Sequence, residues 1–401
     1  MYSDSIVHYD EHYKRCYERL RIVKVYFFQP GQFNRTPQKT NPFFDPIIDV
    51  CKKHGITYRV WCMERHPGES GYGAHWGLSS CLFIYDIIAL RFIKWFHLPE
   101  RPVFKFFGWI ANVLTLGRYR ADICITVAGV HLELLQGIAP HARLVDLQHG
   151  VIGPGHEGYF ENVWKLKGRL RNNLQREYWL YGEGFKSLFL REKDNRAFLK
   201  DRLYVIGDVL ELRRGSGRSS DLNQNLRKSI VFSLQYTNSL SIRQMDALTD
   251  GLKSILQQIE TMGIHRHYQV LFKHHPRYEN CYDLTTLLER FPWVKVTCLS
   301  MNELVGMAFY HITAYSTTAF EYAAAGVPTM FYWDVVNPEG KRYFYDTFSY
   351  PIPSNVDIMF SLMNDCATLC RCQEKVKKWY RQFYCRFSES KLERLLNISS
   401  R

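Results

Sequence analysis

The apolar run Tyr268-Gln269-Val270-Leu271-Phe272 leads directly into the polar Lys273-His274-His275-Pro276-Arg277, and this transition indicates the class of fold. A second stretch has the same form. There the apolar run Phe309–Ala314 ends in Tyr315-Ser316-Thr317-Thr318, and the helix-like Ala319–Ala325 follows. Both place polar side chains where a strand ends and a helix begins, which is where open α/β sheets bind ligands. We therefore expect the two stretches to meet at adjacent strand ends as halves of one phosphate-binding site.

On both sides of these two stretches, short apolar runs alternate with helical patterns, and such alternation predicts parallel sheets. The length of 401 residues favours two domains. The fold class is therefore α/β, with two Rossmann-like domains. The expected strands are 22–28, 56–61, 122–127, 144–147, 178–181 and 203–206, then 229–234, 268–272, 294–298, 309–314 and 328–332.

The best linker is the polar segment 211–228, with Gly215-Ser216-Gly217-Arg218-Ser219-Ser220 at its centre. It separates an N-terminal Rossmann-like domain, 1–210, from a C-terminal Rossmann-like domain, 229–370. The basic, amphipathic tail, 371–401, predicts a closing helix. The region 81–120 differs from its surroundings and fits a helical insertion of two helices.

Two interpretations of 81–120 stay open. Its aromatic and aliphatic residues alternate with basic ones, among them Arg91, Lys94 and Lys105, against the acidic Asp86 and Glu100. It is either a buried helical pair whose basic side chains reach the surface, or a basic, aromatic face that contacts an anionic membrane as a peripheral protein would.

The formal net charge of +13 indicates an anionic partner, and nucleic acid, membrane surface, nucleotide and glycan all qualify. No DNA- or RNA-binding module is recognisable, so no nucleic acid is expected. The N-terminal residues lack the apolar core of a signal peptide, and no run reaches the roughly 18 apolar residues that cross a bilayer. A cytoplasmic protein is the default expectation.

The first half of the predicted site is basic. Lys273, His275 and Arg277 follow a buried strand beside the rigid Pro276. Cations at such a position are expensive unless they meet an anion, so a phosphate contact is the favoured interpretation.

The second half is a helix start. Thr318 and Glu321 have the spacing of a capping box, and Gly326 and Pro328 end the helix. A helix N-terminus attracts phosphate, and the hydroxyls of Ser316, Thr317 and Thr318 add donors. Glu321 could instead reach a ribose hydroxyl. The alternative, a well-capped helix without a ligand, stays open.

The first domain offers the loop residues Gln148 and Gly150 around His149, at the end of a predicted strand. We expect Gly150 to permit a tight turn and His149 to act as a general base. A purely structural histidine remains the alternative, and His156 and Glu157 are reserve bases. The sequence has no Asp-x-Asp, so neither a metal nor another cofactor is expected.

The order of these motifs resembles bacterial GT-B glycosyltransferases of surface polysaccharide synthesis. The strand that ends in Gln148-His149-Gly150, the Lys273-x-His275-Pro276 stretch and the Ser316–Thr318 run carry the resemblance. The last two are similar to motifs of bacterial sialyltransferases and of CDP-glycerol phosphotransferases. The resemblance spans roughly 120–335, although the acidic motif that supplies the catalytic Asp of those sialyltransferases is missing.

The resemblance implies a GT-B fold, with the two domains facing each other across a cleft. The C-terminal domain would bind the donor nucleotide, with His275, Ser316 and Thr317 at its phosphates, and the N-terminal domain would bind the acceptor near His149.

The function this predicts is a metal-independent glycosyltransferase of a bacterial capsule or lipopolysaccharide. It would move a sugar from a nucleotide-sugar donor, with CMP-linked sugars among the candidate donors, to a lipid-linked or growing surface glycan at the inner face of the cytoplasmic membrane. Three alternatives stay open: a CDP-alcohol phosphotransferase of the same fold, a nucleotide-sugar epimerase, and a non-catalytic protein that binds polyanions or nucleic acid.

Overall fold

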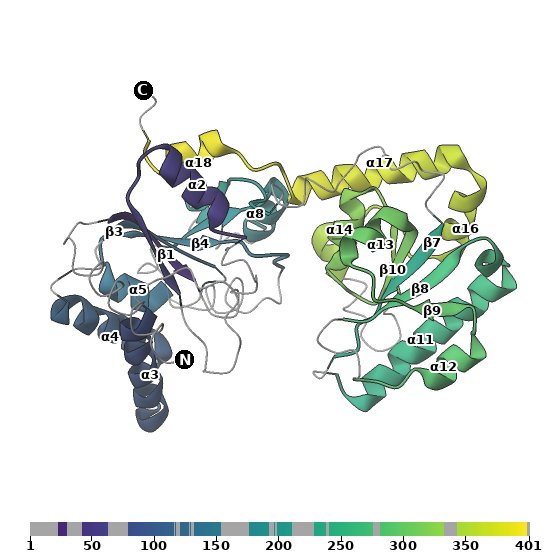
Figure 1. Cartoon of the computed structure of the whole chain (residues 1–401), viewed down its shortest axis with the longest axis horizontal. Helices are drawn as coiled ribbons and strands as arrows, with labels where there is room; N and C mark the ends of the chain where they lie inside the picture. The colour runs from purple at the N-terminus through teal and green to yellow at the C-terminus, as the bar shows by residue number, and fades with distance from the viewer. Residues whose placement is uncertain are drawn as a thin grey trace, which may run out of the picture. The chain divides into compact units, whose positions relative to one another are not determined.

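The chain forms two units, each built on a parallel β-sheet (Figure 1). Unit 1 comprises Met1–Tyr181, Phe189–Leu210 and Phe387–Arg401, and unit 2 comprises Gly182–Leu188 and Glu211–Arg386. The structure is a computed structural model. It describes residues 23–29, 42–62, 79–115, 117, 121–127, 129, 132–153, 176–191, 196, 199–210, 228–237, 240–275, 281–332 and 343–398.

The sheet of unit 1 has six strands in the order β2-β1-β3-β4-β5-β6, and all neighbours pair in parallel. Its central strands are buried on both faces, which explains their almost unbroken apolar sequences. The strands are β1 (Val23–Gln29), β2 (Tyr58–Cys62), β3 (Ala121–Val127), β4 (Arg143–Leu147), β5 (Arg176–Leu180) and β6 (Leu203–Val205). The helices are α2 (Asp45–Lys53), α3 (Ser79–Phe96), α4 (Glu100–Leu114), α5 (Leu132–Ile138) and α18 (Glu389–Leu395).

A pair of glycines sets the contact between α4 and α5. A Cβ on Gly108 would overlap the carbonyl oxygen of Leu134, and a Cβ on Gly137 would overlap the carbonyl oxygen of Lys105. The two backbones can approach this closely only because neither position has a side chain. The contact fixes α4 against α5, and α5 packs with β1, β3 and β4 into the core of unit 1.

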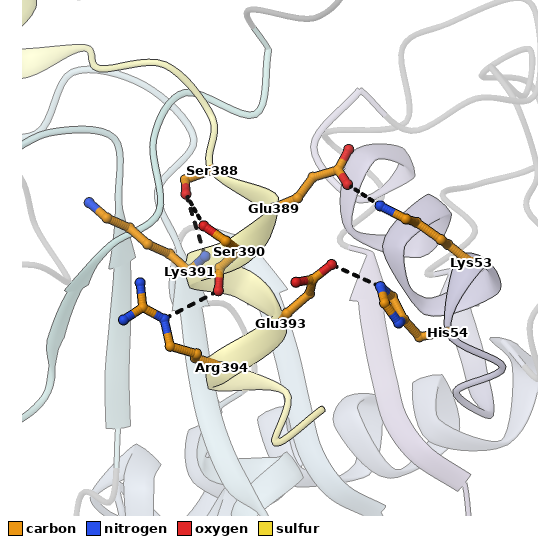
Figure 2. Close-up of polar contacts among 8 residues, drawn as sticks. All are labelled: Lys53, His54, Ser388, Glu389, Ser390, Lys391, Glu393 and Arg394. Atoms are coloured by element: carbon orange, nitrogen blue, oxygen red, sulfur yellow. Dashed lines mark hydrogen bonds and ion pairs between the residues drawn. The ribbon is translucent and has the colours of Figure 1, made fainter. Parts of the chain in front are cut away.

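The last helix, α18, docks on α2 in unit 1 (Figure 2). Glu389 pairs with Lys53 at 2.7 Å, and Glu393 meets His54 Nε2 at 2.8 Å. Arg143 adds a hydrogen bond of 2.6 Å to the carbonyl of Leu395. The end of the chain is therefore part of the N-terminal unit.

The sheet of unit 2 has five parallel strands in the order β11-β10-β7-β8-β9. These are β7 (Ser229–Ser233), β8 (Gln269–Lys273), β9 (Val294–Val296), β10 (Ala308–Thr313) and β11 (Thr329–Phe331). The helices are α11 (Ile242–Thr261), α12 (Thr285–Arg290), α13 (Met301–Met307), α14 (Thr318–Ala324), α16 (Val356–Asn364) and α17 (Cys366–Phe383), with the short turns η3 (Ile264–Arg266) and η4 (Tyr343–Thr347). Side chains of β7 alternate between two cores, because Ile230 and Phe232 join one cluster and Val231 the other.

Helix α8 (Glu183–Phe189) follows a strand of unit 1 but packs in unit 2, where it joins an aromatic cluster. The Phe185 ring lies 5.2 Å from that of Phe383 and 6.3 Å from that of Phe320. Gly182 lets the chain pass the end of α17, where a Cβ would overlap the Phe383 carbonyl oxygen.

The α/β class and all eleven strands are confirmed, with ends that shift by at most two residues. Two helices also occupy the predicted insertion at 81–120. The tail differs from the single helix expected over 371–401, because α17 ends at Phe383 and α18 begins at Glu389. Between them the chain passes from unit 2 to unit 1. The expected boundaries also miss the exchange of Gly182–Leu188 and Phe387–Arg401, and the linker lies outside the described residues except for Lys228.

We predict that Gly108→Ala or Gly137→Ala destabilises unit 1 by about 1–3 kcal/mol, because the added methyl forces α4 and α5 apart. The measurement is the urea midpoint followed by circular dichroism. Gly150→Ala is the matched control, since a Cβ there meets no atom within 4 Å. Equal midpoints for Gly108→Ala and the control would show that the helices do not depend on this contact.

Candidate functional site

The strand order of unit 2 reverses between β7 and β10. The chain runs from β7 to β8 and β9 on one side, and then crosses to β10 and β11 on the other. At such a reversal the connections leave in opposite directions, so the carboxyl ends of β7 and β10 border a crevice where α/β proteins bind ligands. The topology therefore selects this edge of the sheet as the candidate site.

Both motifs predicted from the sequence lie at this edge. The strand register places Thr313 of β10 beside Ser233 of β7, and Ser233 beside Lys273 of β8. The expectation that the motifs follow adjacent strands is wrong, because β7 lies between β8 and β10. Two strand spacings separate the motifs by about 10 Å. A diphosphate has the size to reach both, and the end of β7 lies between its two contacts.

The turn from β10 into α14 is held by side-chain hydroxyls. Thr313 Oγ1 donates to the Ser233 carbonyl at 2.9 Å and accepts from the Ser316 amide at 3.3 Å. Ser316 Oγ in turn accepts from the Thr318 amide at 3.2 Å. These bonds tie the start of α14 to the ends of two strands, so the turn is preorganised.

The predicted capping box of Thr318 and Glu321 is wrong. The N-cap is Thr317, whose side chain makes no capping hydrogen bond, and Thr318 is the first helical residue. Ser316 satisfies the Thr318 amide instead, so the hydroxyl that caps the helix comes from two residues earlier. Ser316 is buried, Thr317 is exposed, and Thr318 and Glu321 are half-buried. The predicted helix end is confirmed, since Gly326 has a φ of +75°.

The basic half of the site begins on β8. Lys273 is its last residue, and Lys273, His274 and His275 are all half-buried. The carbonyl of Lys273 accepts from the Leu234 amide at 2.9 Å, which continues the pairing of β7 and β8 past the end of the strand. Pro276 and Arg277 lie outside the described residues.

Sequence reasoning missed a buried polar chain beneath this edge. His311 of β10 is fully buried, with Nε2 at 2.9 Å from Ser233 Oγ and Nδ1 at 3.0 Å from Thr329 Oγ1. Its ring stacks on Tyr322 of α14, with ring centroids 3.9 Å apart. Burial lowers the pKa of His311 well below 6.5, so the imidazole is neutral and donates through one nitrogen while it accepts through the other. A histidine inside an apolar strand, two residues before Thr313, was the available signal.

In unit 1, the loop after β4 is positioned by Gln148. Its side chain is buried, and it accepts from the Tyr181 amide at 2.8 Å and donates to the Gly150 carbonyl at 2.6 Å. This bridge holds His149, which is half-buried, between two anchored neighbours. Gly150 does not have a positive φ, so the turn does not require glycine there. His156 and Glu157 lie outside the described residues.

A second buried polar group lies next to this loop. Asp146 is 1% exposed, and its Oδ1 accepts from the Gly129 amide after β3 at 2.9 Å. Arg176 of β5 is also buried, and its guanidinium lies 3.5 Å from Glu133 of α5. Asp146 ties Gly129, after β3, to the end of β4, and Arg176 ties β5 to the start of α5, so polar contacts as well as apolar packing hold this part of the sheet. Within the described part of the chain, no group of three His, Cys, Asp or Glu side chains is arranged to hold a metal ion.

No family model and no curated protein matches the sequence. Solved structures do match. A variant of the wall teichoic acid polymerase TagF with CDPG aligns at 13% identity and a TM-score of 0.50, over 99% of this chain and 97% of that one. A second TagF variant aligns at 14% identity and a TM-score of 0.51, over 99% and 98%. The UDP-GlcNAc 2-epimerase of Neisseria meningitidis, bound to UDP-GlcNAc, aligns at 12% identity and a TM-score of 0.52, over 94% and 100%. Together with the two parallel sheets, these likenesses show the GT-B fold that the motifs predicted.

We predict that His311 makes unit 2 sensitive to acid. Its folded-state pKa is lowered, so the stability it contributes is fully present above pH 6.5 and is lost as the pH falls from 6.5 toward the folded-state pKa. In that window the wild type should lose about 1.4 kcal/mol per pH unit more than His311→Asn, which cannot titrate. Urea unfolding at several pH values measures the difference. Parallel pH profiles for the two proteins would contradict the assignment.

Proposed function

We propose that the protein is a metal-independent glycosyltransferase that moves a sugar from a nucleotide-sugar donor to a lipid-linked or growing surface glycan. The observation that carries this proposal is the convergence of a basic segment and a hydroxyl-lined turn at the strand-order reversal of unit 2. Cationic and hydroxyl donors there match the chemistry of a phosphate that must be bound and then leave.

Unit 2 would hold the donor. Lys273 and His275, with Arg277, would contact the phosphates from the β8 side, and Ser316, Thr317 and Thr318 from the α14 side. Donors fixed in place before the reaction stabilise the charge that develops on the leaving phosphate without the cost of reorganisation. Glu321 would reach a ribose hydroxyl. Because the sequence has no Asp-x-Asp, these groups would do the work that a divalent ion does elsewhere.

Unit 1 would bind the acceptor, with His149 as the base. In a single displacement the acceptor hydroxyl oxygen attacks the anomeric carbon and gives its proton to the imidazole, while the bond from that carbon to the phosphate oxygen breaks. The Gln148 bridge would keep His149 in position for this transfer. His156 and Glu157 stay as reserve bases. Synthesis of a bacterial capsule or lipopolysaccharide at the inner face of the cytoplasmic membrane is the setting we propose.

A CDP-alcohol phosphotransferase is the second candidate, because the likeness to TagF with CDPG covers almost the whole of both chains. Phosphorus NMR of the product separates the two candidates, since only the phosphotransferase leaves a phosphodiester in the product. The nucleotide-sugar epimerase is the third, and it would turn over its substrate without an acceptor. The glycosyltransferase proposal requires that glycosyl transfer continues in excess EDTA, because the proposed reaction is metal-independent.

We predict that one of CMP, CDP, UDP and GDP raises the melting temperature, because a nucleotide bound only to the folded state stabilises it. Lys273→Met should weaken the binding of that nucleotide at least about tenfold, because it removes a charge-assisted contact. Lys295→Met is the matched control, since Lys295 is exposed on the neighbouring strand β9. If no nucleotide shifts the melting temperature, the proposed donor site is wrong.

We also predict that His149→Asn lowers kcat by roughly 10²–10⁴, because asparagine can hydrogen-bond but cannot take the proton. The stabilisation by the donor nucleotide should stay unchanged, which separates this variant from Lys273→Met. Initial rates across a range of pH measure the effect. A variant that keeps wild-type turnover would remove His149 from the mechanism.

A further inference from the structure

Helices α3 and α4 of unit 1 are apolar on more than the face that they bury. On α3, Ala89 is buried and Tyr85 and Ile93 pack against the core at helical spacing. On α4, Val103, Phe107 and Ala111 form the buried stripe. A helix that covered only a protein core would carry polar residues on its remaining surface.

The remaining surface carries large apolar side chains instead. Ten of the fourteen large hydrophobic residues that are exposed within the described parts of the chain lie on these helices and the turn between them. Trp95 is 75% exposed, Leu114 67% and Trp109 53%. The others are Ile88, Leu90, Phe92, Phe96, Leu98, Phe106 and Val113. We call these ten residues the α3–α4 face. In Figure 1, α3 projects beyond α4 and α5, away from the sheet of unit 1.

The interpretation of 81–120 as a buried helical pair is therefore only partly right, because each helix buries one stripe and exposes apolar side chains on the rest of its surface. The glycine contact between Gly108 and Gly137 seats one side of α4 on α5. Phe106, Trp109 and Val113 are separated by three and seven positions, so they share one stripe of α4. That stripe lies on the side of the helix opposite Gly108 and therefore faces away from α5.

Charge identifies what covers this face. Arg91 and Lys94 on α3 and Lys105 on α4 are exposed. With Arg101, the two helices carry four basic residues against two acidic ones, Asp86 and Glu100, so they are basic on balance. A second copy that docked through the same face would bring these cations together, which opposes pairing. An anionic lipid surface complements them, and aromatic rings with basic side chains are the composition of helices that lie in a membrane interface. None of the helices that the structure describes is long and apolar enough to span a bilayer.

We infer that the α3–α4 face docks unit 1 on the surface of an anionic lipid bilayer. The tryptophan, phenylalanine and leucine side chains enter the boundary between head groups and acyl chains, while Arg91, Lys94 and Lys105 pair with lipid phosphates through their long stems. The α3–α4 face would be the lipid-binding surface of the membrane-associated enzyme proposed above. Its binding to lipid does not depend on glycosyl transfer. Binding requires no nucleotide and no acceptor.

The test is flotation of the full chain with vesicles, without substrates. We expect the wild type to bind phosphatidylcholine vesicles that contain roughly a third phosphatidylglycerol, and to bind pure phosphatidylcholine at least about tenfold less. Trp95→Ser with Trp109→Ser should lower binding to the anionic vesicles about tenfold or more. Arg91→Gln, Lys94→Gln and Lys105→Gln together should abolish the preference for anionic lipid.

The matched control is Ile242→Ser with Phe360→Ser, which removes two exposed apolar side chains from unit 2 and should leave binding unchanged. Melting temperature and nucleotide binding, measured on every variant, separate a loss of lipid binding from misfolding or from failure of the donor site. The inference is overturned if the wild type does not float with anionic vesicles, or if the control loses as much binding as the tryptophan variant. It is also overturned if light scattering shows a dimer that the tryptophan substitutions dissociate while vesicle binding persists.

Discussion

The double pairing of β7, with β10 on one side and β8 on the other, is the constraint on which the candidate site depends. Parallel strands place all their carboxyl ends at one edge, so this pairing brings Thr313, Ser233 and Lys273 into one row. Segments far apart in the sequence thereby become neighbours in space. The chain then crosses from β9 to β10 on the other side of β7, so the connections after β7 and β10 leave in opposite directions and border a crevice. A slip of the register by one residue would send every side chain of the row to the other face.

Beneath that edge, a buried histidine makes the row rigid. Neutral His311 links hydroxyls on β7 and β11 and stacks on α14, so three strands and a helix share one polar chain. Each partner would be costly to leave unsatisfied in the interior, which holds the hydroxyls in one arrangement. Gln148 has the corresponding role in unit 1, where one amide anchors the loop on both sides of His149. In unit 1 the buried Gln148 directly precedes His149, the residue proposed to meet substrate. In unit 2 the buried His311 lies beneath the strand ends whose residues are proposed to meet substrate.

The two units exchange segments, and packing explains the exchange. Helix α8 follows β5 in the sequence, yet Phe185 fits an aromatic cluster with Phe320 and Phe383 in unit 2. Helix α18 ends the chain, yet its carboxylates pair with Lys53 and His54 of unit 1. Boundaries drawn from polar linkers cannot anticipate this, because the linker marks where composition changes and not which core a later helix joins.

The α/β class, the eleven strands, the two-helix insertion and the placement of both motifs at strand ends could all be predicted from the sequence. These follow from local patterns: apolar runs of strand length, helical spacing, and glycine or proline at the breaks. Three features could not be predicted in this way: β7 separates β8 from β10, Ser316 and not Thr318 caps α14, and His311 lies beneath the candidate site. The tertiary structure also decided that α3 and α4 leave an apolar face exposed. Each of these depends on contacts between residues distant in sequence, and strand order, side-chain partners and exposure have no counterpart in local periodicity.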